Sequence, residues 1–213
     1  MAHSSCQIYL ITPPRIDNLS GFLTDLESAL SAAPIACLQI RLKETDDSAI
    51  IQAASRIIPL CHQYQTTVIM NDRPDLAKHC DADGVHIGQE DMDYFSSREL
   101  LGEDAIIGVT CHNSKELAFE AASAGASYVA FGAFFETSTK SPKTRAELEI
   151  LTWWREAVET PCVAIGGINP RNAEQVIKAG ADFIAVSSGV WNWPEGPADS
   201  IRQLSQLCSS LSE

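Results

Sequence analysis

Acidic side chains follow two short apolar runs of the chain. The run at residues 67–70 precedes Asn71 and Asp72, and the run at residues 85–87 precedes a polar segment that ends at Asp91. If these runs are neighbouring parallel strands, the two aspartates lie at one edge of a sheet, close enough to share a divalent cation with oxygen ligands. The alternative is that each aspartate caps the helix that follows it, because Asp is favoured at helix N-termini.

A third apolar segment carries positive charge at its end. Gln39, Arg41 and Lys43 alternate with apolar residues, so in an extended strand they share one face. Two cations and an amide on an inward-facing side predict a bound polyanion. The alternative is a pair of interior salt bridges to Asp72 and Asp91, because buried charges are usually paired.

Glycines and hydroxyl residues end the last two apolar segments. AIGGI at 164–168 contains Gly167, and VSSG at 186–189 contains Ser187 and Ser188. In barrels of alternating strands and helices, the loops after strands seven and eight often bind a phosphate through backbone N–H groups. A tight turn is the other common use of paired glycines. With Thr137 and Thr139, this side suits a monophosphate.

The remaining polar groups favour a diphosphate on the other side. Arg41, Lys43, Lys140 and a metal held by Asp72 and Asp91 have the charge that a diphosphate requires. Thr110 ends a further apolar run, close to His112 in the sequence. His112 is a candidate for proton transfer, although a single histidine beside a helix start is more often a cap or a packing residue.

Apolar runs alternate with amphipathic segments along the whole chain. The expected strands are 7–12, 36–43, 66–71, 84–88, 105–111, 127–134, 161–168 and 183–187, and the expected helices are 19–32, 47–63, 74–79, 94–101, 114–124, 147–159, 171–179 and 198–211. This order predicts an α/β fold, a closed parallel (β/α)8 TIM barrel, as a single domain over residues 1–213. A doubly wound open sheet is the alternative, but no glycine-rich dinucleotide fingerprint supports it.

Three segments repeat the same unit of polar strand end, helix, turn and strand. NDRPDLAKHCDADGVHIG, HNSKELAFEAASAGASYVAFG and NPRNAEQVIKAGADFIAVS share a turn of the form (G/D)-A-(D/S). Gly125 and Gly180 are expected to end their helices with a positive φ. The longest polar connection, residues 135–145, is either a lid over the site or a surface excursion.

Composition limits the possible classes of protein. The formal charge of −13 opposes binding to nucleic acid or to an anionic membrane. Seven cysteines without a CxxC pair favour buried free thiols in a reducing compartment. No apolar run reaches the roughly 18 residues of a membrane span, and the N-terminus lacks the features of a secretory signal. We therefore expect a cytoplasmic protein with small-molecule partners.

The motifs QxRxK, NDRPDLA, ADGVHIGQED, TSTK, AIGGI and AGADFIAVSS, in this order and spacing, resemble those of thiamine phosphate synthase, also called thiamine phosphate pyrophosphorylase. The resemblance implies a (β/α)8 barrel that joins hydroxymethylpyrimidine diphosphate to thiazole phosphate, giving thiamine phosphate and diphosphate. It implies that the pyrimidine diphosphate is held by Gln39, Arg41, Lys43, Asn71 and Lys140, that Mg²⁺ is held by Asp72 and Asp91, and that the thiazole phosphate is held by Thr137, Thr139, Gly167 and Ser188. Arg41, Lys43, Thr110 and Lys140 are then the catalytic candidates, with Thr110 and Ser187 also in the substrate-binding set.

Some positions depart from the family pattern. Thr110 stands where serine is usual, Ala133 and Glu136 stand where prolines are usual, Ser187 replaces an aliphatic residue, and Leu42 replaces an acid. None of these changes removes a charged ligand. Two other functions remain open: a thiazole tautomerase-like enzyme that uses His112, and a non-catalytic barrel that binds thiamine phosphate. A homodimer also remains open.

Overall fold

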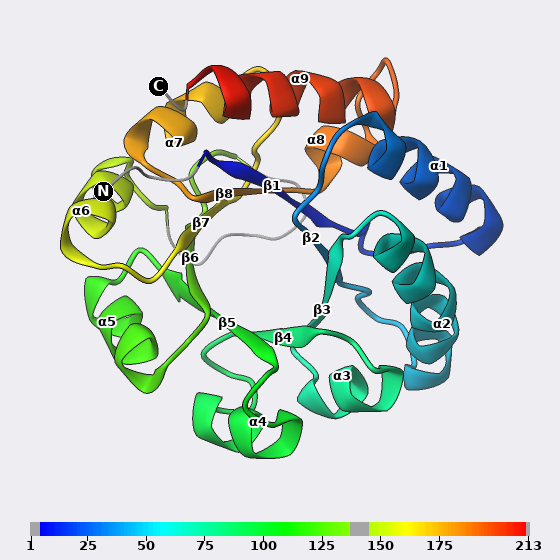
Figure 1. Ribbon diagram of the computed structural model, residues 1–213, viewed down its shortest axis with the longest axis horizontal. Helices are drawn as coiled ribbons and strands as arrows, with labels where there is room; N and C mark the ends of the chain where they lie inside the picture. The colour runs from blue at the N-terminus through cyan, green and yellow to red at the C-terminus, as the bar shows by residue number, and fades with distance from the viewer. Residues whose placement is uncertain (1–4, 137–144, 212–213) are drawn as a thin grey trace.

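Eight parallel strands form a closed barrel, and helices surround it (Figure 1). The computed structural model describes residues 5–136 and 145–211. The strands are β1 (Gln7–Ile11), β2 (Cys37–Ile40), β3 (Thr67–Asn71), β4 (Gly84–Ile87), β5 (Ile106–His112), β6 (Tyr128–Gly132), β7 (Cys162–Ile165) and β8 (Phe183–Val186). Because β1 pairs in parallel with both β2 and β8, the sheet has no open edge. The predicted (β/α)8 barrel is confirmed, and the open-sheet alternative is wrong.

The helices follow the strands in the expected alternation. They are α1 (Leu19–Ala32), α2 (Asp47–Gln63), α3 (Pro74–Cys80), α4 (Tyr94–Leu101), α5 (Lys115–Ala124), α6 (Glu149–Ala157), α7 (Ala173–Ala179), α8 (Ser188–Trp191) and α9 (Pro197–Ser210). The short α8 was not expected, because a single turn gives no periodic pattern. Within the described ranges, no helix has both the length and the apolar character needed to cross a bilayer.

Strand β2 ends earlier than the sequence pattern predicts, at Ile40. Beyond it the backbone bonds to the loop after β1 instead of to a neighbouring strand. The N–H of Arg41 donates to Thr12 Oγ1 at 2.9 Å, and the N–H of Lys43 donates to the carbonyl of Pro14 at 2.8 Å. Arg41 and Lys43 therefore lie in a loop at the carboxyl rim of the barrel.

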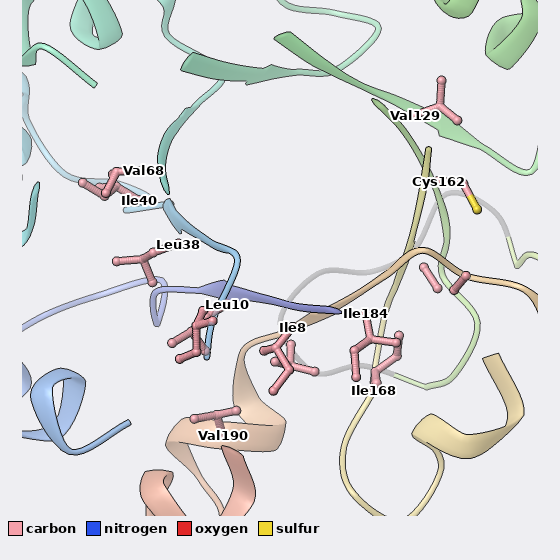
Figure 2. Packing of buried hydrophobic residues seen from close by; sticks show 14 of the residues in the cluster. Ile8, Leu10, Leu38, Ile40, Val68, Val129, Cys162, Ile168, Ile184 and Val190 are labelled. Atoms are coloured by element: carbon pink, nitrogen blue, oxygen red, sulfur yellow. The ribbon is translucent and has the colours of Figure 1, made fainter. Parts of the chain in front are cut away.

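The larger apolar core lies between the strands and the helices. In Figure 2, Ile8 and Leu10 of β1 lie on this outer side, together with Leu38 of the neighbouring strand β2, and Val190 of α8 points toward β1. All four side chains are buried. The apolar residues that alternate along each strand thus supply one continuous outer layer, which fixes the strands against their helices.

A second apolar layer fills the inside of the barrel. Its buried members are Tyr9, Ile11, Cys37, Ile69, Tyr128, Ala130, Val163 and Ala185. The Tyr128 ring lies so close to β5 that a Cβ atom at Gly108 would overlap it. A glycine at this position therefore leaves the space in which a tyrosine from β6 can cross the barrel interior.

The repeated (G/D)-A-(D/S) turn ends in a reciprocal pair of hydrogen bonds at the start of each strand. Asp182 donates its N–H to the carbonyl of Cys162 at 3.1 Å, and Asp182 Oδ2 accepts the N–H of Cys162 at 2.8 Å. Asp83 makes the same pair with Val68, at 2.9 and 2.6 Å. The turn therefore sets the pairing of one strand with its predecessor.

The third repeat has the same arrangement with a hydroxyl group. Ser127 donates its N–H to the carbonyl of Ile107 at 2.8 Å, and its Oγ accepts the N–H of Ile107 at 3.1 Å. Gly125 and Gly180 end their helices with φ of 100° and 109°, as predicted. Asp81 takes the corresponding place before Asp83, with φ of 57°.

We expect Asp182→Ala to lower the free energy of unfolding by about 1–3 kcal/mol, because it leaves the buried N–H of Cys162 without a partner. Asp182→Asn keeps an acceptor oxygen and should lose less. Urea unfolding followed by circular dichroism measures both. The exposed Asp104→Ala is the control and should stay within about 0.5 kcal/mol of the parent chain. An unchanged midpoint for Asp182→Ala would show that the turn does not stabilise the strand pairing.

Candidate active site

A cavity of about 390 Å³ opens at the carboxyl ends of the strands. Every predicted site residue within the described ranges lines it: Gln39, Arg41, Lys43, Asn71, Asp72, Asp91, Thr110, Gly167, Ser187 and Ser188. Thr137, Thr139 and Lys140 lie outside the described residues. The sheet therefore brings together at one rim polar groups that come from β2, β3, β4, β5, β7 and β8 or from the loops after them.

A salt bridge lies on one side of this cavity. Lys43 Nζ is 2.8 Å from Asp72 Oδ2, so one of the two alternative salt bridges is present, but it lies half-exposed at the rim and not in the barrel interior. Asp72 has a φ of 62°, in the left-handed region that a non-glycine residue seldom adopts. Burial lowers the pKa of Arg41, and the negative charge of Asp72 opposes this effect.

Neither aspartate of the predicted metal pair caps a helix. The N-cap position of α3 is Arg73, which makes no side-chain capping bond. Helix α4 is capped by Asp93, whose side chain accepts the N–H of Ser96 at 3.1 Å. The capping interpretation of Asp72 and Asp91 is therefore wrong.

The Asp72 and Asp91 carboxyl groups contact each other. Burial and the neighbouring charge of Asp72 raise the pKa of Asp91, although the N–H of Gly88, 2.7 Å from Asp91 Oδ2, opposes this. Burial alone would raise the pKa of Asp72 as well, but the hydrogen bond and charge of Lys43 outweigh it and the pKa is lowered.

Asp72 and Asp91 offer only oxygen atoms as ligands, and such a pair of carboxylates suits Mg²⁺. Within the described residues, no group of three or more His, Cys, Asp or Glu side chains is arranged to hold a metal. The protein would thus supply two ligands, and water and substrate phosphate would complete the shell, which is the usual way in which Mg²⁺ is bound beside a phosphate. The residues present fit the ion.

A buried chain of hydrogen bonds forms the floor of the cavity. Gln39 Nε2 donates to the Tyr9 hydroxyl at 3.1 Å, and the Tyr9 and Tyr128 hydroxyls are 2.8 Å apart. The Tyr128 hydroxyl lies 3.0 Å from His86 Nδ1, and His86 Nε2 lies 2.7 Å from Thr110 Oγ1. The His86 and Tyr128 rings are stacked, with centroids 5.6 Å apart.

Three members of this chain, Tyr9, Tyr128 and His86, were missed by sequence reasoning. Each lies inside an apolar strand segment, where a polar ring is easily taken as part of the core. The available indication was the period of two, which sends Tyr9 to the opposite face from Ile8 and Leu10. Of the two faces of a barrel strand, only the inner one leads to a cavity at the carboxyl rim.

The end of β5 is shaped by a register shift between Thr110 and His112. Gln89 Nε2 donates to the carbonyl of Thr110 at 2.7 Å, and His112 has a φ of 54°. His112 lines the cavity, and the cap of α5 is Ser114. His112 is therefore not a helix cap, and its position remains compatible with contact to a ligand.

The loops after β7 and β8 meet at the other side of the cavity. Gly167 has a φ of 65°, and a Cβ atom there would overlap the carbonyl of Glu136. The Gly167 carbonyl accepts hydrogen bonds from the side chains of Asn172, at 2.9 Å, and Asn169, at 3.2 Å. The Ser187 hydroxyl donates to the carbonyl of Thr12 at 3.1 Å, so it connects β8 to β1.

Together these features define a class of protein: a (β/α)8 barrel whose rim holds two cationic and two acidic side chains on one side and a glycine loop on the other. The chain matches the family model described as thiamine monophosphate synthase over residues 8–190. It is 52% identical over 204 residues to the thiamine-phosphate synthase of Rhodospirillum centenum, a match that covers 96% of this chain and 98% of the relative. It is 47% identical over 209 residues to the thiamine-phosphate synthase of Hyphomonas neptunium, covering 96% and 95%.

A solved structure agrees with the sequence comparisons. The thiamine phosphate pyrophosphorylase of Pyrococcus furiosus superposes with a TM-score of 0.84 at 32% identity, over 96% of each chain. The chain belongs to the thiamine monophosphate synthase family. The resemblance seen in the sequence motifs is confirmed.

Acid should destabilise the barrel through His86. Burial lowers the pKa of His86 to about 4, whereas the unfolded chain takes up this proton near pH 6.5. Between these values the unfolded state binds more protons, so stability falls as the pH falls through this window and is regained above it. From pH 7 to pH 5 this group alone should cost about 2 kcal/mol, and His86→Gln should lose that part of the pH dependence.

Urea unfolding at the two pH values measures the effect. The exposed His79→Gln is the matched control and should keep the pH dependence of the parent chain. Equal pH dependence in the His86 variant and the parent would contradict a buried neutral imidazole.

Proposed function

We propose that this protein joins 4-amino-2-methyl-5-hydroxymethylpyrimidine diphosphate to thiazole phosphate, with release of diphosphate, to make thiamine phosphate. Membership of the family supports this transferase role in thiamine biosynthesis. The observation that carries the proposal is the joint placement of Arg41, Lys43, Asp72 and Asp91 at one cavity. Seven free cysteines, most of them buried, favour a reducing compartment, in agreement with a cytoplasmic enzyme.

The diphosphate is proposed to lie on the side of Arg41 and Lys43. Arg41 offers a planar set of donors for phosphate oxygens, and Lys43 offers a compact charge that is shared with Asp72 in the free protein. Mg²⁺ held by Asp72 and Asp91 would neutralise further charge on the diphosphate. Lys140, outside the described residues, is the third proposed cation. Asn71 and Gln39 line the same cavity and would orient the pyrimidine.

The reaction exchanges one bond at the pyrimidine methylene for another. The carbon–oxygen bond to the diphosphate breaks with its electron pair on the leaving oxygen, and the thiazole nitrogen donates a pair to the methylene carbon. Arg41, Lys43 and Lys140 stabilise the charge that develops on the leaving group. The protein contributes positioning and electrostatics, which is sufficient when the leaving group takes the charge.

The thiazole phosphate is proposed to lie at the loops after β7 and β8. Gly167 and Ser188 would present backbone N–H groups to the phosphate, and Thr137 and Thr139 would add hydroxyl donors. The Ser187 hydroxyl is already bonded to the carbonyl of Thr12. Its contribution would therefore come from the backbone N–H, which explains how serine can replace an aliphatic residue at this position.

Two other functions are distinguishable from this one. A tautomerase-like relative would use His112, which lines the cavity, but would not require Arg41, Lys43 and the two aspartates at the same site. A non-catalytic sensor would bind thiamine phosphate tightly without turnover. Incubation with both substrates and Mg²⁺, followed by chromatographic detection of thiamine phosphate, separates the three.

Asp72→Ala should lower kcat by about 10²–10³-fold, the scale of losing one strong electrostatic contact in a transition state. It removes a proposed metal ligand and the partner of Lys43. Release of diphosphate in a coupled assay measures this. The exposed Asp104→Ala is the control with unchanged turnover, and treatment with a chelator should abolish the activity of the parent chain until Mg²⁺ is restored. Near-normal diphosphate release by Asp72→Ala would rule out the proposed metal role.

Gly167→Ala should raise KM for the thiazole phosphate about tenfold, because the left-handed backbone costs a residue with a Cβ about 1–2 kcal/mol and the loop must shift. The new Cβ would also overlap the carbonyl of Glu136. Gly102→Ala is the control: its φ of 88° and ψ of 173° also disfavour a residue with a Cβ, but its Cβ meets no atom within 4 Å and it lies away from the cavity. Equal KM values in the two variants would argue against a phosphate at Gly167.

A further inference from the structure

The chain of hydrogen bonds in the barrel floor joins two proposed substrate ligands. Gln39 and Thr110 line the cavity on opposite sides of the barrel, on β2 and in β5. Between them lie only Tyr9, Tyr128 and His86, which are 3%, 7% and 8% exposed. Because bulk water has little access to these groups, the direction of each hydrogen bond is set by its neighbours.

The direction can be worked out from the Gln39 end. An amide nitrogen only donates, so the Tyr9 oxygen accepts from Gln39 Nε2 and the Tyr9 proton is free to donate. Its partner at 2.8 Å is the Tyr128 oxygen. Tyr128 has then accepted one bond, and its own proton is directed to His86 Nδ1 at 3.0 Å.

The direction at Tyr128 fixes the form of the His86 ring. If Nδ1 accepts a hydrogen bond, the neutral imidazole carries its proton on Nε2. That proton is then donated to Thr110 Oγ1 at 2.7 Å. The Thr110 oxygen thus accepts a hydrogen bond from His86, and the Thr110 hydroxyl proton remains to be donated to a group in the cavity.

One competing acceptor lies beside this chain of hydrogen bonds. The Tyr9 hydroxyl also contacts the Cys37 sulfur. Sulfur is a weak acceptor, whereas a phenol oxygen at 2.8 Å is a strong one. The Tyr9 proton therefore goes to Tyr128, and the direction along the chain is kept.

We propose that Tyr9, Tyr128 and His86 are positioning residues that fix the Thr110 hydroxyl as a hydrogen-bond donor to a ring nitrogen of the bound pyrimidine. The choice of ligand atom rests on the proposed function; the direction of the chain does not. A pyrimidine with an exocyclic amine keeps an unprotonated ring nitrogen beside it, which can accept from Thr110. The corresponding oxo compound carries N–H there, and two donors would face each other.

The reverse orientation of the chain explains why the direction matters for selectivity. If Thr110 donated to His86, the ring would carry its proton on Nδ1 and Tyr128 would donate to Tyr9. The Tyr9 proton would then be left with the Cys37 sulfur, a weak acceptor, because Gln39 Nε2 cannot accept. The oxo analogue requires this arrangement or a rotation of the Gln39 amide. We expect the 4-oxo analogue to bind at least about tenfold more weakly, the scale of one lost hydrogen bond.

The form of His86 can be measured without substrate. Protein labelled with ¹⁵N histidine is examined at pH 7.5 by long-range ¹H–¹⁵N correlation, and the His86 signals are assigned by their absence in His86→Gln. The expected result is a single neutral ring protonated at Nε2. A ring protonated at Nδ1, or at both nitrogens, would overturn the proposal even if the enzyme is active.

Tyr128→Phe removes the hydroxyl that connects Tyr9 to His86 and so interrupts the chain of hydrogen bonds. The expected results are a mixture of both neutral forms of His86 and about a tenfold lower kcat/KM for the pyrimidine diphosphate, with KM for the thiazole phosphate unchanged. Tyr94→Phe is the matched control, because it removes a tyrosine hydroxyl that donates to Gly125 far from the floor. It should leave the His86 spectrum and both kinetic constants unchanged.

Two substitutions at the end of the chain complete the test. Thr110→Ser keeps the hydroxyl and should keep the Nε2-protonated form of His86. Thr110→Val removes the acceptor of that proton, so the Nε2-protonated form should no longer be the single form. An unchanged His86 spectrum in both Tyr128→Phe and Thr110→Val would overturn the positioning role. If the parent chain has the Nε2 form but makes no thiamine phosphate, the proposed function fails while the assigned direction of the floor stands.

Discussion

Closure of the sheet through the pairing of β1 with β8 is the constraint on which the other features depend. It places Leu10 opposite Val186 and brings the end of the last strand to the beginning of the first. The Ser187 hydroxyl then reaches the carbonyl of Thr12, whose side chain in turn accepts the N–H of Arg41. The proposed phosphate loop and the proposed diphosphate cation are thus connected through one residue of the loop after β1.

The cavity places two cationic side chains beside acidic ones in a chain that is strongly acidic as a whole. The protein carries a formal charge of −13, so the two proposed substrates, each of which carries phosphate, are repelled at long range. Arg41 and Lys43 offset this repulsion only at the rim, and Lys43 is already paired with Asp72. The contact between Asp72 and Asp91 favours a cation on the acidic side. Binding of an anion and a divalent cation together is consequently better balanced in charge than binding of either alone.

The sequence predicted helices and turns accurately where the apolar periodicity and the turn residues are distinct. The bounds of α1, α2 and α4 agree with the expected ranges, because each helix begins after a polar residue whose side chain caps it, namely Asn18, Asp46 and Asp93. The site residues in the described ranges were found because polar groups at strand ends are unusual in apolar surroundings. The end of β2 was missed, because the bonds of Arg41 and Lys43 to the loop after β1 are tertiary and leave no local pattern.

The capping interpretation of Asp72 and Asp91 failed for a related reason. Asp93, only two residues beyond Asp91, takes the cap of α4, and local sequence does not distinguish one aspartate from the other. The buried floor was missed because its members come from β1, β2, β4, β5 and β6. A network that crosses a barrel interior depends on the register of the strands, which a single sequence does not specify.

The bond between Ser187 and Thr12, 175 residues apart in the chain, also has a consequence for biosynthesis. While the polypeptide emerges from the ribosome, β1 through β6 can be exposed before the strands that complete the ring exist. The edges of β1 and β6 are then unpaired and able to join other chains. The nascent protein is therefore most vulnerable to aggregation late in translation, and the catalytic cavity is among the last parts to form, since its final wall comes from β7 and β8.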